Sequence, residues 1–355
     1  MPSFPAEPEI QSLASKLAQL SQGLPAHVHN NLIERALAVL VRLMGEEVDR
    51  LDWKILTAAM EDLEGAFKVF YSYRHIRKVT IFGSARTPSH DSEYQLATAF
   101  ARCVVQHGFM AITGAGGGIM EAANQGAGRE QSFGLNIQLP FEQGANPHIV
   151  NDPKLINFKY FFTRKLFFLR ESDAIAVFPG GFGTLDEVFE ALTLCQTGRY
   201  GPVPVVLIAA PDTGYWEEWD EYIHGHLVKR GLVSPDDRSL YAITHDLDVA
   251  CQIIGDFYRV YHSSRYVGEQ YVIRLNYELS DRAIAQLNEE FSDILRRGKI
   301  EKTQAFPQEK HDETLALPRL AFEYNQRNAA RLTQMIRRIN QLGTVPPEAE
   351  HPERK

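Results

Sequence analysis

The sequence predicts an α/β fold whose core is a doubly wound parallel sheet, and three observations lead to this prediction. First, five short apolar runs recur along the chain: VTIF (79–82), FMAIT (109–113), FGLNI (133–137), AIAVF (174–178) and VPVVLI (203–208). Second, the segments around 92–107, 118–129, 155–171, 184–198 and 215–230 are long enough for crossover helices. Third, the runs are continuously apolar, which is typical of strands covered on both faces. This Rossmann-like arrangement binds its ligands beyond the carboxyl ends of the strands.

The segments on either side of this core follow other patterns. Residues 1–75 are predicted to form a helical extension, with helices over EIQSLASKLAQLSQG, NNLIERALAVLVRLMGEE and DWKILTAAMEDLEGAFKVF. The α/β domain is placed at residues 76–262 and a small α+β extension at 263–342. In this extension we expect YVIRLN as a strand, SDRAIAQLNEEF as a helix capped by Ser280, KIEKTQAF as a strand, and a basic amphipathic helix near 318–341 that ends at Gly343. Residues 343–355 are expected to be a disordered tail.

The composition is that of a soluble globular protein, with 44% hydrophobic and 23% charged residues in a chain of 355. The net charge of -8 argues against a general nucleic-acid or membrane-surface binder, because such proteins carry a basic excess. Cys103, Cys195 and Cys251 lie far apart without a CxxC pair, so we expect neither a disulfide framework nor a zinc–thiolate site. The start MPSFPAEPEIQ lacks the features of a signal peptide, so a cytoplasmic protein in a reducing compartment is expected.

The loop PGGFGT (179–184) predicts a phosphate site. Glycines let backbone N–H groups face an anion, and the N-terminus of the following helix adds a favourable partial charge. The Thr184 hydroxyl can contribute a further hydrogen bond. The loop is not a P-loop, because the lysine of GxxxxGK[ST] is absent, and Leu185 and Asp186 stand where a dinucleotide fingerprint needs its third glycine.

Glu187 has two interpretations. TLDE (184–187) fits a capping box, in which Glu187 only folds back onto a backbone N–H. Alternatively, Glu187 is catalytic and shares a face with Glu190, while the helix is buried through Leu185, Val188, Phe189 and Leu192. The spacing by itself favours capping and leaves catalysis open.

Two more loops follow predicted strands. TGAGGGIME (113–121) is a second glycine-rich turn between a strand and a helix, and it can be explained as a tight turn that needs positive φ. GSAR (83–86) offers the Ser84 hydroxyl and the Arg86 guanidinium, although Arg86 fits a solvated loop residue equally well. Because the loops after neighbouring strands meet at one sheet edge, we favour a single shared ligand.

YFFTRKLFFLRES (160–172) places Arg164 and Lys165 among aromatic residues. In one interpretation this is a core helix whose basic side chains reach solvent. In the other, Arg164 faces the loop at 179–184 and binds a carboxylate or phosphate. The histidines show no HExxH spacing and no GxSxG elbow is present, so neither a metal site nor a serine nucleophile is predicted.

These motifs together resemble the LOG family, the cytokinin riboside 5′-monophosphate phosphoribohydrolases, long misannotated as lysine decarboxylases. PGGFGTLDE (179–187) is similar to the family signature PGGxGTxxE. GSAR, TGAGGGIMEAAN and TRK match further family motifs, in order, and the resemblance covers about residues 76–262. The two extensions are similar to those of the longer bacterial nucleotide 5′-monophosphate nucleosidases of the same superfamily.

The resemblance implies specific roles for individual residues. Arg164 and Glu187 match the catalytic pair of the family. The residues that match its 5′-phosphate loop are Gly180, Gly181, Gly183 and Thr184. Those expected to line the nucleoside are Ser84, Gly117, Gly118, Met120, Glu121 and Lys165. No cofactor and no metal are implied.

The implied reaction is hydrolysis of the N-glycosidic bond of a nucleoside 5′-monophosphate, either AMP-like or a cytokinin riboside monophosphate. Glu187 would stabilise the cationic transition state or activate water, with Arg164 holding it ionised. The alternative is a non-catalytic carrier of the same fold, which binds a nucleotide or molybdenum cofactor. A true lysine decarboxylase would need pyridoxal phosphate on a lysine, and the Ser-His-Lys triplet common in such enzymes is absent. Family members are dimers or larger, so we expect a homo-oligomer with no nucleic-acid or membrane partner.

Overall fold

The structure, a computed structural model, describes residues 12, 15, 16, 29–138, 144–211, 213–309 and 313–344. The chain divides into two compact units, Met1–Glu64 and Gly65–Lys355. The predicted helix over EIQSLASKLAQLSQG lies outside the described residues except for positions 12, 15 and 16. The predicted disordered tail lies outside them from residue 345 onward.

The first unit contains α2 (Asn30–Met44) and the beginning of α3 (Arg50–Tyr71). Both helices agree with the prediction, which rested on apolar residues at helical spacing. Several of these apolar side chains are exposed, namely Leu32, Val39, Met44, Leu51 and Met60. The helices are therefore amphipathic but keep part of their apolar surface uncovered.

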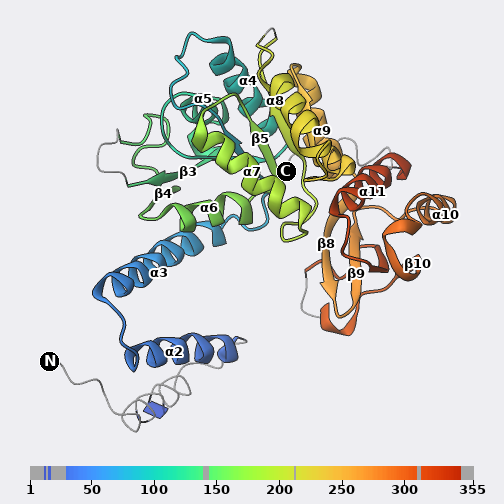
Figure 1. The fold of residues 1–355 in the computed structure, drawn as a ribbon, viewed down its shortest axis with the longest axis horizontal. Coiled ribbons are helices and arrows are strands. Elements are labelled where there is room, and N and C mark those ends of the chain that lie inside the picture. Colours follow the sequence, from blue (N-terminus) through green and yellow to red (C-terminus); the bar gives the residue numbers. More distant parts are fainter. Residues whose placement is uncertain are drawn as a thin grey trace. The chain divides into compact units, whose positions relative to one another are not determined.

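The second unit is built on a seven-stranded parallel sheet (Figure 1). Its strands are β1 (Lys78–Phe82), β2 (Met110–Thr113), β3 (Ser132–Ile137), β4 (Leu155–Phe158), β5 (Ala174–Val177), β6 (Val205–Ile208) and β7 (Tyr241–Thr244). They lie in the order β4-β3-β2-β1-β5-β6-β7, so the strand order reverses between β1 and β5. The predicted doubly wound, Rossmann-like α/β fold is confirmed.

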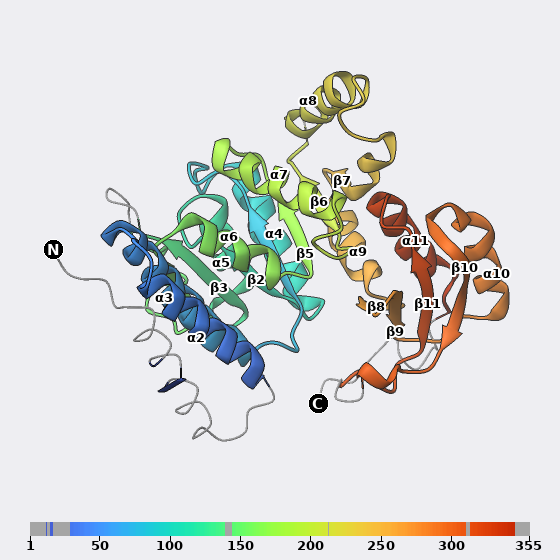
Figure 2. The ribbon, with the colours of Figure 1, turned by 60° about the horizontal axis from the view of Figure 1, so that its bottom comes forward.

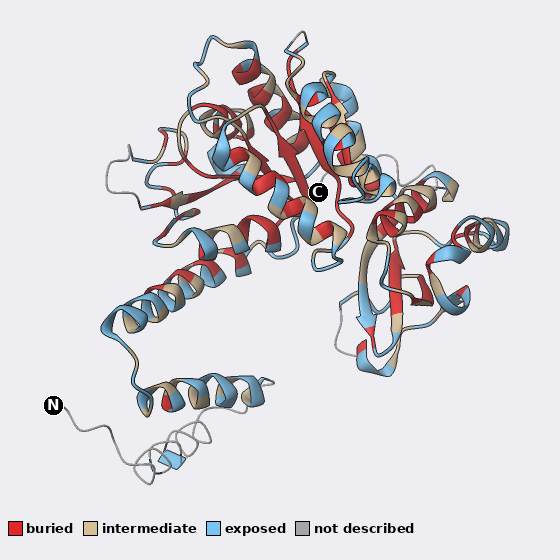
Figure 3. Ribbon diagram, in the orientation of Figure 1, coloured by how far each residue is buried: buried red, intermediate tan, exposed pale blue. Residues whose placement is uncertain are grey.

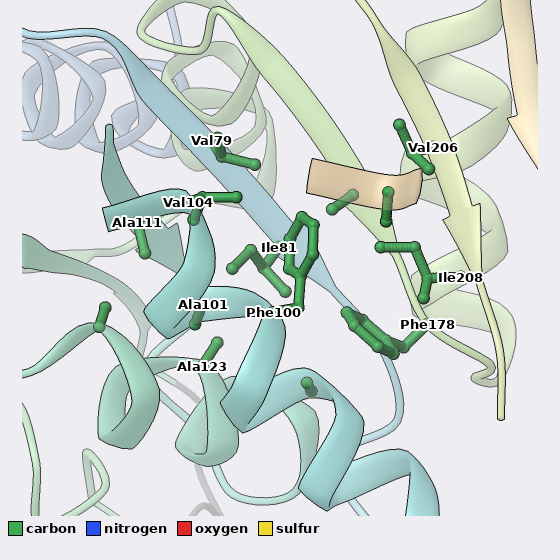
Figure 4. Packing of buried hydrophobic residues seen from close by; sticks show 14 of the residues in the cluster. Val79, Ile81, Phe100, Ala101, Val104, Ala111, Ala123, Phe178, Val206 and Ile208 are labelled. Atoms are coloured by element: carbon green, nitrogen blue, oxygen red, sulfur yellow. The ribbon is translucent and has the colours of Figure 1, made fainter. Parts of the chain in front are cut away.

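Side chains of β1 alternate between the two faces of this sheet, and helices cover both. Val79 and Ile81 belong to a core shared with α4 (Ser92–Gln106), α5 (Ile119–Ala127) and α9 (Leu247–Phe257) (Figure 4). On the other face, Thr80 donates to the Phe168 carbonyl of α6 (Phe161–Arg170) at 2.9 Å. Strands enclosed in this way are buried along their length (Figure 3), which explains why their sequences are continuously apolar.

The remaining helices of this part complete the connections between strands. They are α7 (Phe182–Gln196), α8 (Tyr215–Tyr222), which continues as a π-helix (Ile223–Val228), and the short 3-10 helices Arg129–Gln131 and Pro235–Leu240. The last turns of α3 also pack here, because the ring of Phe70 stacks on Phe133 of β3 and Phe167 of α6.

Two strands of the sheet were not predicted. Residues 155–171 were expected to form one helix, but β4 occupies Leu155–Phe158 and only Phe161–Arg170 is helical. The YAIT run of β7 was not recognised as a strand. Both lie at the edges of the sheet, where they pair on one side only and are not buried along their whole length, so their sequences are not held to a continuous apolar run.

The chain after α9 forms a second, four-stranded antiparallel sheet (Figure 2). Its strands are β8 (Tyr261–Val267), β9 (Gln270–Leu275), β10 (Leu295–Thr303) and β11 (Arg319–Tyr324), in the order β10-β11-β9-β8. Helices α10 (Asp281–Glu290) and α11 (Ala329–Leu342) share an apolar core with the sheet, and short 3-10 turns span Ser292–Ile294 and Pro307–Glu309. Ser280 caps α10 as predicted, its side chain accepting from the Ala283 N–H.

The helix predicted near 318–341 is wrong over its first part. RLAFEY (319–324) is β11, which pairs with both β9 and β10. Helix α11 begins only at Ala329, where the Asn328 side chain caps it. The run LAF (320–322) is compatible with a helix taken by itself, and pairing with strands distant in sequence decides otherwise.

The expectation of no disulfide is also corrected. Cys103 of α4 and Cys251 of α9 form a disulfide, with their Cα atoms 6.5 Å apart. The two helices lie side by side on the same face of the sheet, which a sequence separation of 148 conceals. Cys195 is free and buried in α7.

Candidate active site

The three predicted loops meet where the strand order reverses. Beyond the ends of β1 and β5, the Ser84 N–H donates to the Pro179 carbonyl at 3.0 Å. The Ser84 carbonyl in turn accepts from the N–H of Ile119, the first residue of α5, at 3.0 Å. Ser84 therefore joins the loops after β1, β2 and β5 through its backbone. This reversal point is where open α/β sheets bind ligands.

Two glycines allow the loops to come this close. Gly118 has φ +61°, and a Cβ there would clash with the Ser84 carbonyl and with Ala85. A Cβ on Gly180 would clash with the Thr184 hydroxyl and lie 2.9 Å from the Ser84 nitrogen. Larger side chains at these positions would force the loops apart.

The beginning of α7 is open to solvent. Gly181 is its N-cap residue and makes no side-chain cap, and Gly181, Phe182 and Gly183 are exposed. A Cβ on Gly181 or Gly183 would meet no atom within 4 Å. The first N–H groups of a helix have no partner within the helix. They are therefore available to an anion here, with the helix dipole in its favour.

The capping-box interpretation of Glu187 is wrong. Helix α7 begins at Phe182, so Thr184 lies inside the first turn and is not the N-cap residue. The buried stripe also differs from the expected one. It consists of Thr184, Glu187, Val188, Ala191 and Cys195, while Phe189 is 40% exposed. Glu187 thus lies on the buried face of α7, which is not the face that the sequence pattern predicted to be buried.

The Glu187 carboxyl is in an unusual environment for an acid. The residue is only 6% exposed, and among the described residues its Oε2 atom has no hydrogen-bond partner. Burial raises the pKa of Glu187 from 4.5 to about 7, with smaller opposing effects from nearby charges. An acid with such a pKa can exchange a proton near neutral pH, as a general base or acid requires.

Arg164 and Lys165, on consecutive positions of α6, surround this carboxyl with positive charge. Lys165 Nζ lies 2.6 Å from Asp186 Oδ2, 3.8 Å from Glu187 Oε2 and 3.7 Å from Glu190 Oε2. Burial acts to lower the pKa of Lys165, but the hydrogen bond to Asp186 and the other carboxylates outweigh it and the pKa is raised. Lys165 therefore stays charged.

The Arg164 guanidinium lies over the rings of Phe161 and Phe168, 5.0 and 5.4 Å from their centroids. A Cβ on Gly114, in the loop after β2, would be 3.9 Å from its Nη1 atom. The charge of Arg164 also acts to lower the pKa of Glu187. The Arg164 side chain thus extends from α6 towards the loop after β2 and is near enough to Glu187 for its charge to act on that acid.

The loop after β2 is held by buried polar residues that the sequence analysis missed. Ala115 has φ 62°, a conformation that costs energy for a residue with a side chain. The Asn146 side chain donates to the carbonyls of Ala115 and Gly116 at 3.1 and 3.0 Å and to Asn124 Oδ1 at 2.9 Å. Thr113 donates to the same Asn124 oxygen at 2.8 Å. Asn146 is distant in sequence from the loop, so no local pattern pointed to it.

The other residues predicted to line the nucleoside belong to the same loops. Met120 packs its sulfur against Gly114, where a Cβ would approach within 2.7 Å. Gly117 lies close to Glu121, whose Oε2 would be 3.8 Å from a Cβ there. Ser84 uses its hydroxyl to accept from the Arg86 N–H at 3.1 Å, and Arg86 itself is exposed.

A second missed residue lies on the helix after β6. The Tyr215 hydroxyl donates to the Gly180 carbonyl at 2.5 Å. The loop after β6 lies at the same edge of the sheet as the loops after β1, β2 and β5, but no role was predicted for it. A tyrosine directly after such a loop was the available signal.

No group of three or more His, Cys, Asp or Glu side chains is arranged to hold a metal ion within the described ranges. Over the same residues, no helix combines the length and apolar character needed to span a bilayer.

Comparison with known proteins finds similarity over a part of the chain that includes Arg164, Glu187 and the loop at 179–184. A family model described as "Possible lysine decarboxylase" matches residues 120–254. The chain is 28% identical over 184 residues to a probable cytokinin riboside 5′-monophosphate phosphoribohydrolase of Oryza sativa subsp. japonica, covering 50% of this chain and 71% of that protein. It is 26% identical over 189 residues to a cytokinin riboside 5′-monophosphate phosphoribohydrolase of Rhodococcoides fascians, covering 50% and 89%.

Among solved structures, the chain is similar to the molybdenum cofactor carrier protein of Chlamydomonas reinhardtii. The sequence identity is 19%, the similar region covers 50% of this chain and 94% of that one, and the TM-score is 0.35.

Proposed function

Because this chain belongs to the LOG family of hydrolases, we propose that it hydrolyses the N-glycosidic bond of a nucleoside 5′-monophosphate. The substrate is AMP-like or a cytokinin riboside monophosphate, and the names of the curated relatives support the second of these. Water adds to C1′ of the ribose, the bond from C1′ to the base nitrogen breaks, and the base leaves with a proton. The products are the free base and ribose 5-phosphate.

The phosphate end of the substrate binds at the beginning of α7. Gly180, Gly181, Gly183 and Thr184 hold it through backbone N–H groups and the Thr184 hydroxyl. The exposure of Gly181 and Gly183 supports this assignment, since a ligand can reach the N–H groups without displacing a side chain. The phosphate is remote from the bond that breaks, and its binding energy can fix the ribose in position.

Glu187 acts at the sugar end. With a rise of about 1.5 Å per residue, its Cα lies about 6 Å further along α7 than that of Gly183. This separation suits a ligand whose phosphate lies at the helix N-terminus and whose sugar lies one turn further along. The transition state carries positive charge on the ribose, so the ionised carboxylate stabilises it or removes a proton from the attacking water.

Arg164 and Lys165 favour the ionised form of Glu187. Both charges act to lower its pKa, against the larger effect of burial. The contacts of Lys165 with three carboxylates support a role in holding Glu187, while a direct contact of Lys165 with the nucleoside stays a prediction. Ser84, Gly117, Gly118, Met120 and Glu121 line the nucleoside from the loops after β1 and β2.

The observation that carries this proposal is the position of Glu187: a buried carboxyl with a pKa of about 7, one turn from an open helix N-terminus. The test incubates the purified full-length chain with a panel of nucleoside 5′-monophosphates and the matching nucleosides, and measures free base and ribose 5-phosphate. We expect base release from a monophosphate, little from its nucleoside, and none by the Glu187→Gln variant. Equal base release by wild type and Glu187→Gln would show that Glu187 is not catalytic.

The same experiment decides between an enzyme and the non-catalytic carrier of nucleotides or molybdenum cofactor. A carrier has no need of a buried acid that changes protonation near neutral pH. If nucleotide binds tightly and no monophosphate of the panel releases its base, the carrier function is correct and the hydrolase proposal is wrong.

A further inference from the structure

Tyr215 makes one contact that the proposed function does not use. It is the first residue of α8, and its hydroxyl donates to the Gly180 carbonyl at 2.5 Å, in the middle of the proposed phosphate loop. No feature of the fold requires this contact, since the phosphate loop is already joined to β1 through Ser84 and Pro179.

The position of Tyr215 is fixed independently of the phosphate loop. Its neighbour Trp216 is fully buried and donates from Nε1 to the Ile208 carbonyl at the end of β6, at 3.1 Å. The Tyr215 ring packs edge-on against the Trp216 ring, with centroids 4.8 Å apart. Gly214 turns the chain into the helix with φ 63°. Tyr215 therefore extends from a rigid support on β6 to the loop after β5.

A peptide group links this contact to the anion site. The peptide bond is planar and trans, so its carbonyl and the following N–H point in opposite directions. The Ser84 N–H donates a hydrogen bond to the Pro179 carbonyl and thereby directs the Gly180 N–H away from Ser84. In the same way, the Tyr215 hydroxyl donates a hydrogen bond to the Gly180 carbonyl and directs the Gly181 N–H away from Tyr215.

The Gly180–Gly181 peptide needs such a constraint. A peptide between two glycines can rotate at little steric cost, because neither neighbour has a Cβ. Rotation would present the Gly180 carbonyl oxygen to the anion in place of the Gly181 N–H. An oxygen facing the phosphate repels it, whereas the N–H binds it.

We propose that Tyr215 is a positioning residue of the phosphate loop: by holding the Gly180 carbonyl, it keeps the Gly181 N–H directed at the substrate phosphate. This inference rests on the proposed function for its substrate. It assigns to Tyr215 an effect on phosphate affinity and not on the bond-breaking step, because the Tyr215 hydroxyl binds the Gly180 carbonyl, whereas Glu187 lies on the buried face of α7 beside Lys165.

The test compares wild type, Tyr215→Phe and Tyr222→Phe as full-length proteins. Tyr222 is a matched control, a half-exposed tyrosine at the other end of α8. Calorimetry with inorganic phosphate and with ribose 5-phosphate measures the Kd of each protein. Loss of one hydrogen bond should weaken phosphate binding by Tyr215→Phe about 5–10-fold, with Tyr222→Phe like wild type.

Kinetics and stability separate a positioning role from a structural one. For Tyr215→Phe, KM for the monophosphate should rise by the same factor as the phosphate Kd, with kcat within about twofold of wild type and a Tm lowered by at most about 4 °C. An unchanged phosphate Kd in Tyr215→Phe overturns the inference, as does a wild type that binds no phosphate. If wild type binds phosphate but hydrolyses no monophosphate, the proposed hydrolase fails, and the phosphate Kd of Tyr215→Phe still decides on Tyr215.

Discussion

Replacing Glu187 by glutamine should make the protein more stable at high pH relative to wild type. Folding buries this carboxyl and raises its pKa from 4.5 to about 7, so the folded protein binds a proton that the unfolded chain has released. Stability then falls as pH rises through the interval between the two values, because the unfolded state binds fewer protons there. Glutamine cannot ionise and avoids this loss.

The size of the effect follows from the two pKa values. One pKa unit corresponds to about 1.4 kcal/mol, and part of the loss has already occurred at pH 5. Between pH 5 and pH 8 the difference in unfolding free energy between Glu187→Gln and wild type should therefore grow by about 2–3 kcal/mol. The change with pH is more informative than the difference at one pH, since it cancels any effect of glutamine on packing.

The assay is urea unfolding of both proteins at pH 5, 6, 7 and 8, followed by circular dichroism. Glu289→Gln is the control, because Glu289 is an exposed residue on α10 and the substitution makes the same chemical change. The change with pH should be larger for Glu187→Gln than for this control. If the difference between Glu187→Gln and wild type is constant with pH, burial does not hold a proton on Glu187 and the electrostatic reasoning is refuted.

Three further predictions follow from other features. The activity on a nucleoside monophosphate should rise with pH through about 7, because the raised pKa leaves Glu187 protonated below that pH; a flat profile of kcat/KM from pH 5.5 to 8 contradicts this. Asn146→Ala should lower the unfolding free energy by about 2–3 kcal/mol and raise KM for the monophosphate, because it removes the side-chain donor to the Ala115 and Gly116 carbonyls. An unchanged urea midpoint and an unchanged KM would contradict this role of Asn146. Thiol titration of the unfolded chain should find one thiol, Cys195, before reduction and three afterwards. Cys103→Ser should lower the unfolding free energy by about 2–5 kcal/mol. Three thiols without reductant would disprove the disulfide.

The central sheet was largely predictable because its interior strands are enclosed on both faces. Enclosure makes the residues of β1, β2 and β5 apolar or small, apart from Lys78 at the start of β1, and this leaves continuous runs that a single sequence displays. The edge strands β4 and β7 show no continuous apolar run in the sequence, and β11 lies in a segment that was predicted to be helical. All three are strands because they pair with segments that are distant in the sequence.

The candidate site divides in a similar way. The glycine loops were found from the sequence, since only glycine permits the close contacts at Gly118 and Gly180. The role of Glu187 stayed open there, because TLDE fits a capping box as well as a catalytic motif. Once the structure places the helix start at Phe182, the capping box is impossible. Asn146 and Tyr215 were missed because each acts on a loop that is far away along the chain.

Features that depend on neighbouring residues could be predicted, and features that depend on distant segments could not. The sequence alone was sufficient for the fold class, for the positions of the glycine-rich loops and for the resemblance to the LOG family, since each depends on residue types at short spacing. Only the folded chain shows that Glu187 is buried with a pKa of about 7, that Lys165 lies among three carboxylates, and that Tyr215 holds the Gly180 carbonyl. Burial, charge separation and the orientation of a peptide group depend on segments that meet only when the sheet has formed.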